Sequence, residues 1–575
     1  MAMDMKAIKE TAIWKLFEKG RDYQYLTNMI SDTDRNYRFY NGNQWEGAIL
    51  GDVEPVQKNF IKPVVKYKVS VIHDNLYAVI YSSQNYENTE FQLQAEEICR
   101  MLNRYAHHVW EHDALDYKGR RVTNDAAINS EGIIYVDFNK KLMMPVNEIL
   151  DKNDVFYGDE NEDDIQRQPY ILVRKRLPLS AAIEWAKEMG LPVEKEEYII
   201  ADEDSFDNAG DSAKVELDGK VTIVYKLWKE NGTVHFAAST RLCDIVADKD
   251  IKLEMYPIAH FVWEEKKGSA RGEGEVRNLI PNQIEVNKTE MRRILTVKTQ
   301  AYPQKVVDAE RVSNPDALYN VGAVIKTRGS TVDDVRKVVG TIPPAQMSAD
   351  VKMLQDDLIQ MTRDLAGAGD SATGQIDPES ASGRAILAVQ QASQAPMTEQ
   401  KETYKRFVED LAKIWLEYMI VHSKDGVALE REVKDPQTGK SLVVVERLSQ
   451  ETLRKLKAVV KIDITPKSVY DRFAQEQTIE NLLVQGLFTP NRVGELEVYA
   501  NLLDDDSVAP KAKILEAVKQ IKEEMQRIAQ IDSQMQLMQQ RAQQFIMEDP
   551  DGQAQQIADA RMSLMQNAQA EEIPG

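Results

Sequence analysis

One short pattern in the sequence could do chemistry. His108, Glu111 and His112 fit the inverted zinc-peptidase motif HxxEH. Histidines four residues apart share one face of a helix, where they could ligate zinc beside a glutamate general base. Five residues are a weak signal, and His112 also continues an apolar stripe through Tyr105 and Val109. The pattern favours a histidine that packs within the fold, with zinc catalysis as the alternative.

Three other motifs lack parts that their chemistry needs. The acidic stretch 159–164 resembles the start of a calcium loop, but Asp164 stands where that loop needs glycine. Residues 272–274 form a GxG without the third glycine of a dinucleotide site. Residues 439–441 read Gly-Lys-Ser, but Lys434 replaces the first glycine of a P-loop. We therefore expect no metal site, no cofactor and no nucleotide pocket.

The charge balance limits the partners. Lys and Arg total 72 and Asp and Glu total 93, which gives a net charge of −21. This is the wrong sign for a protein that grips nucleic acid by neutralising phosphates. Tight, static DNA binding is therefore disfavoured.

The two cysteines and the lack of long apolar runs indicate the compartment. Cys99 and Cys243 lie far apart, without a CxxC motif, which is typical of a reducing compartment. No apolar run approaches about 18 residues, and the first residues lack a signal-peptide core. We expect a soluble intracellular product that has no contact with a membrane.

Hydrophobic periodicity predicts the elements that would position any site. At 575 residues the chain exceeds one ordinary core, so several domains are expected. The first 260 residues indicate an α+β body, and Asn231-Gly232 predicts a tight hairpin turn. Helices are expected at 6–30, 59–82, 94–118 and 178–189, and strands at 133–138, 142–149, 170–176, 221–229 and 233–238.

Four aromatic residues crowd the stretch 37–45 around the pair Asn41-Gly42. We expect them to clamp a surface turn onto the body, with stacking on nucleic-acid bases as the alternative.

Long helices dominate after residue 271. One helix is expected to run to about residue 301, and a second over 346–366 has apolar residues three and four apart. Such a narrow stripe favours packing against neighbouring helices, and its members are Val351, Leu354, Leu358, Met361 and Leu365.

The second helix lies between a compact insert before it and a stretch of small, polar and acidic residues after it. A compact insert at 302–345 is expected to hold strands at 304–307 and 321–326 and a short helix at 315–319. After it, residues 366–379 are small, polar and acidic, which predicts a mobile loop. A long helix then runs to residue 422, with Pro396 expected to bend it.

This order of elements resembles the portal proteins of tailed double-stranded DNA bacteriophages, the head-to-tail connector family. The similarity rests on three short segments, 39–45, 279–287 and 382–385, and on their order over roughly residues 30–470. The resemblance implies a predominantly helical α+β portal fold that assembles into a ring around a channel. It assigns wing to 1–262, first stem helix to 263–301, clip to 302–345, second stem helix to 346–366, tunnel loop to 367–379, kinked tunnel helix to 380–422, wing return hairpin to 423–467, crown to 468–510, and a Gln-rich helical barrel or tail to 511–575.

The resemblance also implies a function, which is that of a conduit and not of an enzyme. Twelve copies would form the channel at one capsid vertex of the virion, through which DNA is packaged and later ejected. The large terminase would hydrolyse ATP, and head-completion or adaptor proteins, the major capsid protein and scaffolding protein would be further partners. The chain would be made in the cytoplasm of the bacterial host.

Several polar residues would then meet DNA or partner proteins. Acidic and polar groups of the loop would face DNA without sequence specificity: Asp370, Ser371, Thr373, Gln375, Asp377 and Glu379. Sparse channel cations could be Lys352 and Arg384. A local basic excess in the insert is either a solvated face or a partner surface: Lys305, Arg311, Lys326, Arg328, Arg336 and Lys337.

Two alternatives come from other classes of protein. A zinc peptidase predicts stoichiometric zinc, and a coiled-coil scaffold predicts a rod-like oligomer without a pore. The heptad rhythm over 511–547 is compatible with the scaffold. Neither alternative explains the insert between two long helices.

Overall fold

The structure is a computed structural model, and it describes most of the chain up to residue 468. Described are residues 10–49, 54–73, 75–83, 89–202, 219–320, 322–328, 338–343, 346–348, 350–369, 395–423, 427–434, 441–457, 460–468, 527–528, 530–541, 556–557 and 559–563. The chain divides into two compact units, Met1–Pro466 and Lys467–Gly575. In the second unit the described residues 530–541 are helical, as the heptad rhythm predicts.

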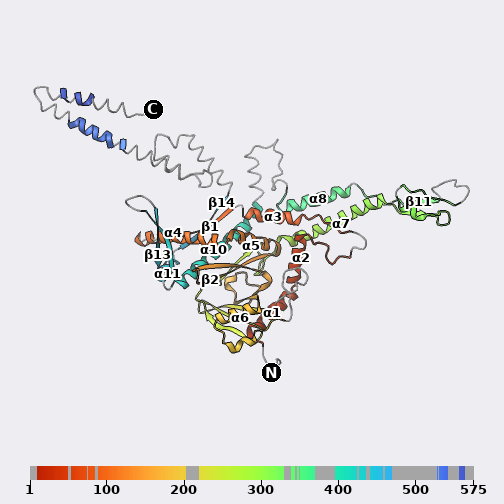
Figure 1. Ribbon diagram of the computed structural model, residues 1–575, viewed down its shortest axis with the longest axis horizontal. Helices are drawn as coiled ribbons and strands as arrows, with labels where there is room; N and C mark the ends of the chain where they lie inside the picture. Colours follow the sequence, from red (N-terminus) through yellow and green to blue (C-terminus); the bar gives the residue numbers. More distant parts are fainter. Residues whose placement is uncertain are drawn as a thin grey trace. The chain divides into compact units, whose positions relative to one another are not determined.

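The first unit contains both helices and sheets, so the expected α+β class is confirmed (Figure 1). Its helices are α1 Ala12–Leu26, α2 Met29–Asn41, α3 Ile61–Ile72, α4 Thr89–His112, α5 Leu115–Asn129, α6 Leu179–Glu188, α7 Glu275–Ala301, α8 Asp350–Leu365, α10 Thr398–His422 and α11 Gln450–Lys457. Its strands are β1 Asn75–Ser83, β2 Glu131–Asn139, β3 Met144–Leu150, β4 Val155–Tyr157, β5 Tyr170–Pro178, β6 Lys220–Glu230, β7 Thr233–Ser239, β8 Asp244–Asp250, β9 Ile258–Val262, β10 Lys305–Val307, β11 Val339–Thr341, β12 Val427–Lys434, β13 Ser441–Leu448 and β14 Val460–Ser468.

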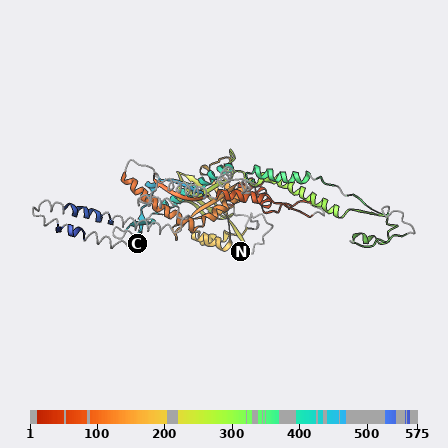
Figure 2. The same ribbon diagram turned by 90° about the horizontal axis from the view of Figure 1, so that it is seen from above.

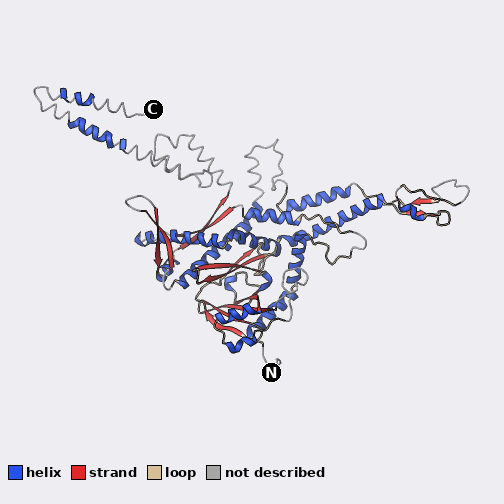
Figure 3. Cartoon of the chain, viewed as in Figure 1, coloured by secondary structure: helices blue, strands red, loops and turns tan. Residues whose placement is uncertain are grey.

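Two antiparallel sheets form the body (Figure 3). One has the strand order β3-β2-β9, and the other is a meander in the order β4-β5-β6-β7-β8. The predicted hairpin joins β6 to β7, and its two turn residues, Asn231 and Gly232, have φ values of 52° and 86°. Positive φ at both positions is what a two-residue type I′ turn needs, so the turn prediction is confirmed.

The main core lies where α5 and α10 cover the three-stranded sheet. Helix α10 packs on β9 and β2, and α5 packs on β2. Aromatic rings fill this layer: the ring of Phe261 on β9 lies 5.5 Å from that of Tyr404 on α10, edge to face. Trp263 and Trp415 are also among the largest fully buried side chains. Rings of this size supply much of the apolar area that holds α10 on the sheet.

One predicted helix is partly a strand. The helix expected over 59–82 ends at Ile72, and residues 75–83 form β1, which pairs with β14. Tyr77, Val79 and Tyr81 are buried at every second position of that strand. This period of two is the signal for a strand, and it outweighs the helical spacing seen from the sequence.

Two other predicted helices are each broken by one residue with a positive φ. The helix expected over 6–30 breaks at Asn28, whose φ is 57°, and α2 begins after it. The helix expected over 94–118 breaks at Ala114, whose φ is 49°, and α5 follows. Asparagine tolerates the left-handed region, but alanine does so at a cost, so the second break had no sequence signal.

The aromatic stretch 37–45 belongs to the body, as expected. Phe39 and Tyr40 are buried, and the indole Nε1 of Trp45 donates a hydrogen bond to the carbonyl of Val56 at 2.9 Å. Helix α2 ends at Gly42, whose φ is 95°. The buried rings of Phe39 and Tyr40 and the bound indole of Trp45 therefore favour the clamp over base stacking.

A carboxyl group between α2 and α5 makes stability depend on pH. The hydroxyl of Tyr37 donates to Asp125 at 2.9 Å. Burial, opposed by this hydrogen bond and helped by nearby Asp151, raises the pKa of Asp125 from 3.8 to about 6. The folded state therefore keeps a proton that the unfolded state releases, so stability falls as the pH rises from about 4 to about 6.

The variant Asp125→Asn tests this linkage. The neutral amide keeps an acceptor for Tyr37 and does not titrate, so we expect it to be more stable than the wild type by on the order of 1–3 kcal/mol at pH 7. Melting temperatures measured between pH 4 and 8 should show a difference that grows up to about pH 6 and is constant above it. A difference that does not change with pH would refute the assignment.

Candidate functional site: the paired helices α7 and α8 and the segments they carry

The first half of α7 is held by segments that lie far away in the sequence. Gln283 accepts a hydrogen bond from the backbone N–H of Phe60 at 3.0 Å and donates to the carbonyl of Lys58 at 2.8 Å. Asn287 accepts from the backbone N–H of Lys58 at 3.1 Å and donates to the side chain of Gln44. Both amides are buried, so these bonds fix where the helix lies. Two of the three segments behind the family resemblance thus touch each other.

Just before α7, Arg271 is the centre of a buried ionic network. Its guanidinium lies 2.5 Å from Glu131 and 2.9 Å from Glu160, and over the ring of Tyr157. Glu131 has no exposed surface on its side chain and also accepts from His260 at 2.8 Å. Burial alone would raise the pKa of Glu131, but Arg271 and the His260 hydrogen bond outweigh burial and hold it well below its usual range. The network joins β2, β4 and β9 to the start of α7.

The Gly272-Glu273-Gly274 motif is explained by packing. A Cβ on Gly272 would lie 2.1 Å from Cγ1 of Val262 and 2.3 Å from the carbonyl oxygen of Glu264. A Cβ on Gly274 would lie 2.8 Å from the backbone nitrogen of Ser130. Both glycines therefore let the chain pass close against the sheet before α7 begins.

Helices α7 and α8 lie side by side and meet through polar side chains (Figures 1 and 2). Asn282 donates to the hydroxyl of Thr362 at 2.9 Å. Gln355 accepts from Arg293 at 2.7 Å and donates to Glu290, also at 2.7 Å. Thr362 and Gln355 are 4% and 1% exposed, so the side of α8 that meets α7 is the buried one.

The apolar stripe predicted on α8 does not face α7. Leu354 is 67% exposed, Met361 65% and Leu365 82%. Val351 and Leu358 of the stripe are partly buried, and Leu358 packs against the core. Since the neighbouring helix is contacted by polar residues, most of the stripe has no cover within the described residues of this chain.

The start of the expected loop is a compact helix cap. Backbone N–H groups of Gly367 and Ala368 donate to the carbonyls of Asp364 and Arg363, and Gly367 has a φ of 70°. This is a Schellman cap, in which glycine takes the left-handed position. A Cβ on Gly367 would lie 3.7 Å from Pro396, so the chain leaves α8 and returns to the described residues at nearly the same place.

The far end of that segment is fixed to the body. Pro396 lies in a 3-10 turn at Ala395–Met397, directly before α10. Farther along α10, the indole of Trp415 donates to Asn147 at 3.0 Å, and the hydroxyl of Tyr418 donates to the carbonyl of Val136 at 2.9 Å. The described part of the predicted kinked helix is thus rigidly attached to the three-stranded sheet.

Most of the predicted channel residues lie outside the described residues. These are Asp370, Ser371, Thr373, Gln375, Asp377, Glu379 and Arg384. Lys352 is described and is exposed on α8.

The insert between α7 and α8 carries an exposed basic face. Strand β10 pairs with β11, not with residues 321–326, so the strand predicted there is corrected. Val312 forms an isolated bridge with Thr327 and is buried. Three basic residues beside this bridge are exposed: Arg311, Lys326 and Arg328. The guanidinium of Arg311 lies 3.7 Å from the carboxylate of Asp308.

Three further basic residues of the insert belong to the predicted partner surface: Lys305, Arg336 and Lys337. The ammonium group of Lys305 donates to the carbonyl of Leu318, so it serves the fold of the insert itself. Arg336 and Lys337 lie outside the described residues.

The HxxEH pattern has its side chains on the surface of α4. His108 and His112 are exposed, with ring centroids 6.2 Å apart, and Glu111 contacts His107 at 3.3 Å. The expectation that His112 packs inside the fold is therefore wrong, because α4 ends at this residue on the flank of its buried face. In the part of the chain that the structure describes, no group of three or more His, Cys, Asp or Glu could hold a metal ion.

The acidic stretch 159–164 is a turn, as expected. The side-chain amide of Gln168 donates to the carbonyls of Asp159 and Glu162 at 2.7 and 3.0 Å. Residues 439 and 440 of the Gly-Lys-Ser pattern lie outside the described residues.

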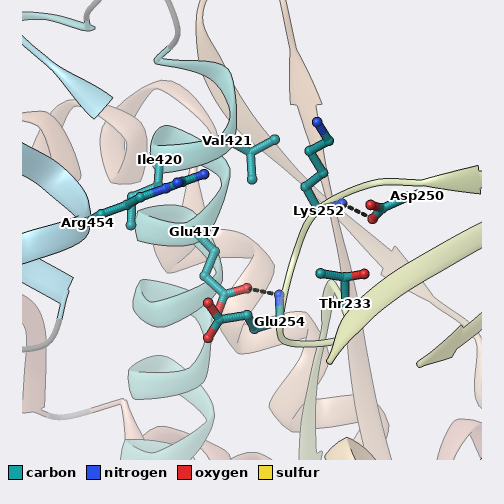
Figure 4. Close-up of a pocket in the computed structure, with 8 residues that line it drawn as sticks. All are labelled: Thr233, Asp250, Lys252, Glu254, Glu417, Ile420, Val421 and Arg454. Atoms are coloured by element: carbon teal, nitrogen blue, oxygen red, sulfur yellow. Dashed lines mark hydrogen bonds between the residues drawn. The ribbon is translucent and has the colours of Figure 1, made fainter. Parts of the chain in front are cut away.

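A hollow of about 500 Å³ lies between α10, α11 and the turn after β8 (Figure 4). Glu417 points into it from α10, but its carboxylate accepts hydrogen bonds from the backbone N–H groups of Glu254 and Met255 at 2.9 and 3.0 Å. Asp250 accepts from the backbone of Lys252 at 2.8 Å. Glu417 therefore holds the turn on α10 and Asp250 stabilises the turn itself, so both carboxylates serve the fold.

Among the described helices, none is both long and apolar enough to cross a membrane. The sequence matches the family model described as phage P22-like portal protein over residues 192–572, about two thirds of the chain. The match includes α7, the insert, α8 and α10. No match was found among curated proteins.

Proposed function

Because the chain belongs to the P22-like phage portal protein family, we propose that it forms the channel through which double-stranded DNA enters and leaves a phage capsid. The family match confirms the resemblance that the sequence indicated. Proteins of this family are structural, and the family implies an oligomeric assembly associated with the capsid vertex of the virion. The match over residues 192–572, which spans α7, the insert and α8, is the observation that carries the proposal.

In this proposal twelve copies surround the channel. The body up to residue 262 is the wing, α7 and α8 are the stem, and the insert 302–345 is the clip. The pairing of α7 with α8 supports this division, because a stem needs two long helices that run side by side with the insert at their far end. The C-terminal residues 468–510 and 511–575 form the crown and a helical tail.

In this proposal the acidic channel repels the phosphates of DNA and does not bind them tightly. A net charge of −21 per chain gives weak affinity for phosphates, and weak affinity lets DNA slide at every register. The loop 367–379 supplies acids at Asp370, Asp377 and Glu379, and α8 supplies a sparse ring of cations at Lys352. The Schellman cap and Pro396 support this role, because they hold both ends of the segment 370–394 at one place.

Replacing Asp370, Asp377 and Glu379 together by alanine tests the loop. We expect rings to assemble normally, while the amount of DNA packaged per particle falls by about tenfold or more, as phosphates bind a channel that no longer repels them. Quantitative measurement of DNA in purified particles gives the answer, with Asp356→Ala on α8 as a control. Unchanged packaging and retention would remove the loop from the mechanism.

The clip is the docking surface for the large terminase during packaging and for head-completion or adaptor proteins afterwards. The exposed residues Arg311, Lys326 and Arg328 support an acidic protein partner, since they lie close together beside the bridge between Val312 and Thr327. Lys305 is also exposed, but its ammonium group donates to the carbonyl of Leu318 within the insert, so we expect a smaller contribution from it. The major capsid and scaffolding proteins are further partners in this proposal.

A further inference from the structure

The exposed face of α8 combines an apolar seam with a row of acids. Leu354, Met361 and Leu365 are 65–82% exposed. Three exposed acids recur at intervals of seven residues beside these apolar residues: Asp350, Asp357 and Asp364. They lie on the side of α8 away from Gln355 and Thr362. At about 100° per residue, this row points away from α7.

The exposed face of α7 has the opposite charge. Met291 and Leu295 lie on the side of α7 opposite Arg293, which contacts α8. Lys288 and Arg292 flank these two apolar residues. Lys288 lies 3.1 Å from Glu285, an exposed contact that is worth little in water. Over their whole lengths α7 carries more basic than acidic residues, and α8 carries more acidic than basic ones.

We propose that the α8 face of one copy packs on the α7 face of the next copy. The proposal rests on the portal function above. The three exposed apolar residues of α8 recur at intervals of seven and four, which keeps them on one side of the helix and fits another helix, and the charges beside the two faces are complementary. DNA does not fit the α8 face, because the aspartates of that face would repel the DNA phosphates.

The placement of the two faces explains why the assembly closes. They lie on opposite sides of the α7–α8 pair, so each copy uses one face toward one neighbour and the other face toward the second neighbour. Such head-to-tail contacts produce rings when the rotation closes, whereas a self-complementary face would stop at a dimer. Helices α7 and α8 of successive copies therefore alternate around the ring.

Reversing the charges on the α8 face, on the α7 face, and on both faces together tests the contact. We expect Asp350→Lys with Asp357→Lys to lower the ring population at a given concentration by about tenfold or more, because like charges then face each other twelve times. Lys288→Asp with Arg292→Asp should have the same effect. The combination of all four changes should restore rings. Native mass spectrometry gives the populations, and circular dichroism shows that each variant is folded.

The matched control is Asp356→Lys, which makes the same charge change on α8 but away from the seam. It should leave the ring population unchanged. Rings that persist in both reversed variants, or a fourfold variant that fails to restore them, would overturn the proposed contact while leaving the portal function standing. A wild-type protein that forms no rings would overturn both.

Discussion

Replacing Arg271 by methionine is expected to destabilise the protein by about 3–5 kcal/mol, because it leaves Glu131 buried without its cation. Glu131 has no exposed surface and would keep only the hydrogen bonds from His260 and Tyr157. Methionine fills a similar volume, so the loss measures the charge and its hydrogen bonds rather than a cavity. Urea unfolding followed by circular dichroism at pH 7 measures the change.

Arg277→Met is the matched control for this prediction. Arg277 lies on α7 near the same junction, but its side chain is 63% exposed and 3.6 Å from Glu273. We expect a change of about 0.5 kcal/mol or less there. Equal losses in the two variants would show that the network around Arg271 does not hold the junction.

The same network makes the protein sensitive to acid. The pKa of Glu131 is depressed in the folded state, so its contribution is fully present above about pH 4.5 and is lost as the pH falls below that value. The Arg271→Met variant lacks this contribution, and its stability should therefore approach that of the wild type at low pH.

The second large effect is expected at Gly272. Alanine there would place its Cβ within 2.3 Å of the carbonyl oxygen of Glu264, which is backbone and cannot rotate away. The strand end must shift, and we expect a loss of about 3 kcal/mol or more, at the upper end of overpacking effects. Thermal unfolding of Gly272→Ala beside the wild type measures it.

Gly340→Ala controls for the change from glycine to alanine itself. A Cβ on Gly340 would come no closer than 4.0 Å to Val306, so the substitution should be nearly neutral. A Gly272→Ala protein with wild-type stability would mean that the GxG motif is not a packing motif.

Much of the fold could be predicted where local signals agree with tertiary packing. The Asn231-Gly232 turn and the helix from residue 275 to residue 301 have strong local signals, and both are confirmed. The strand β1 was missed because its valine, isoleucine and tyrosine residues also fit a helical spacing. Its pairing with β14 joins residues almost 400 positions apart, and no local pattern contains that information.

The site was predictable in its residue types but not in its contacts. The basic residues of the insert were named from composition, yet only the structure separates Lys305, which is bound to Leu318, from Arg311 and its neighbours. The sequence predicts an apolar stripe on α8, but the direction of that stripe depends on the polar contacts of Gln355 and Thr362 with α7. Arg271 was missed altogether, because an isolated arginine in a loop gives no sign of the three strands that meet around it.

Native mass spectrometry of the purified protein, with negative-stain electron microscopy of the same sample, tests the central claim most directly. The portal assignment predicts ring particles with a central hole and a mass of about twelve chains. A rod without a hole, or a compact monomer or dimer under conditions in which the chain is folded, would contradict it.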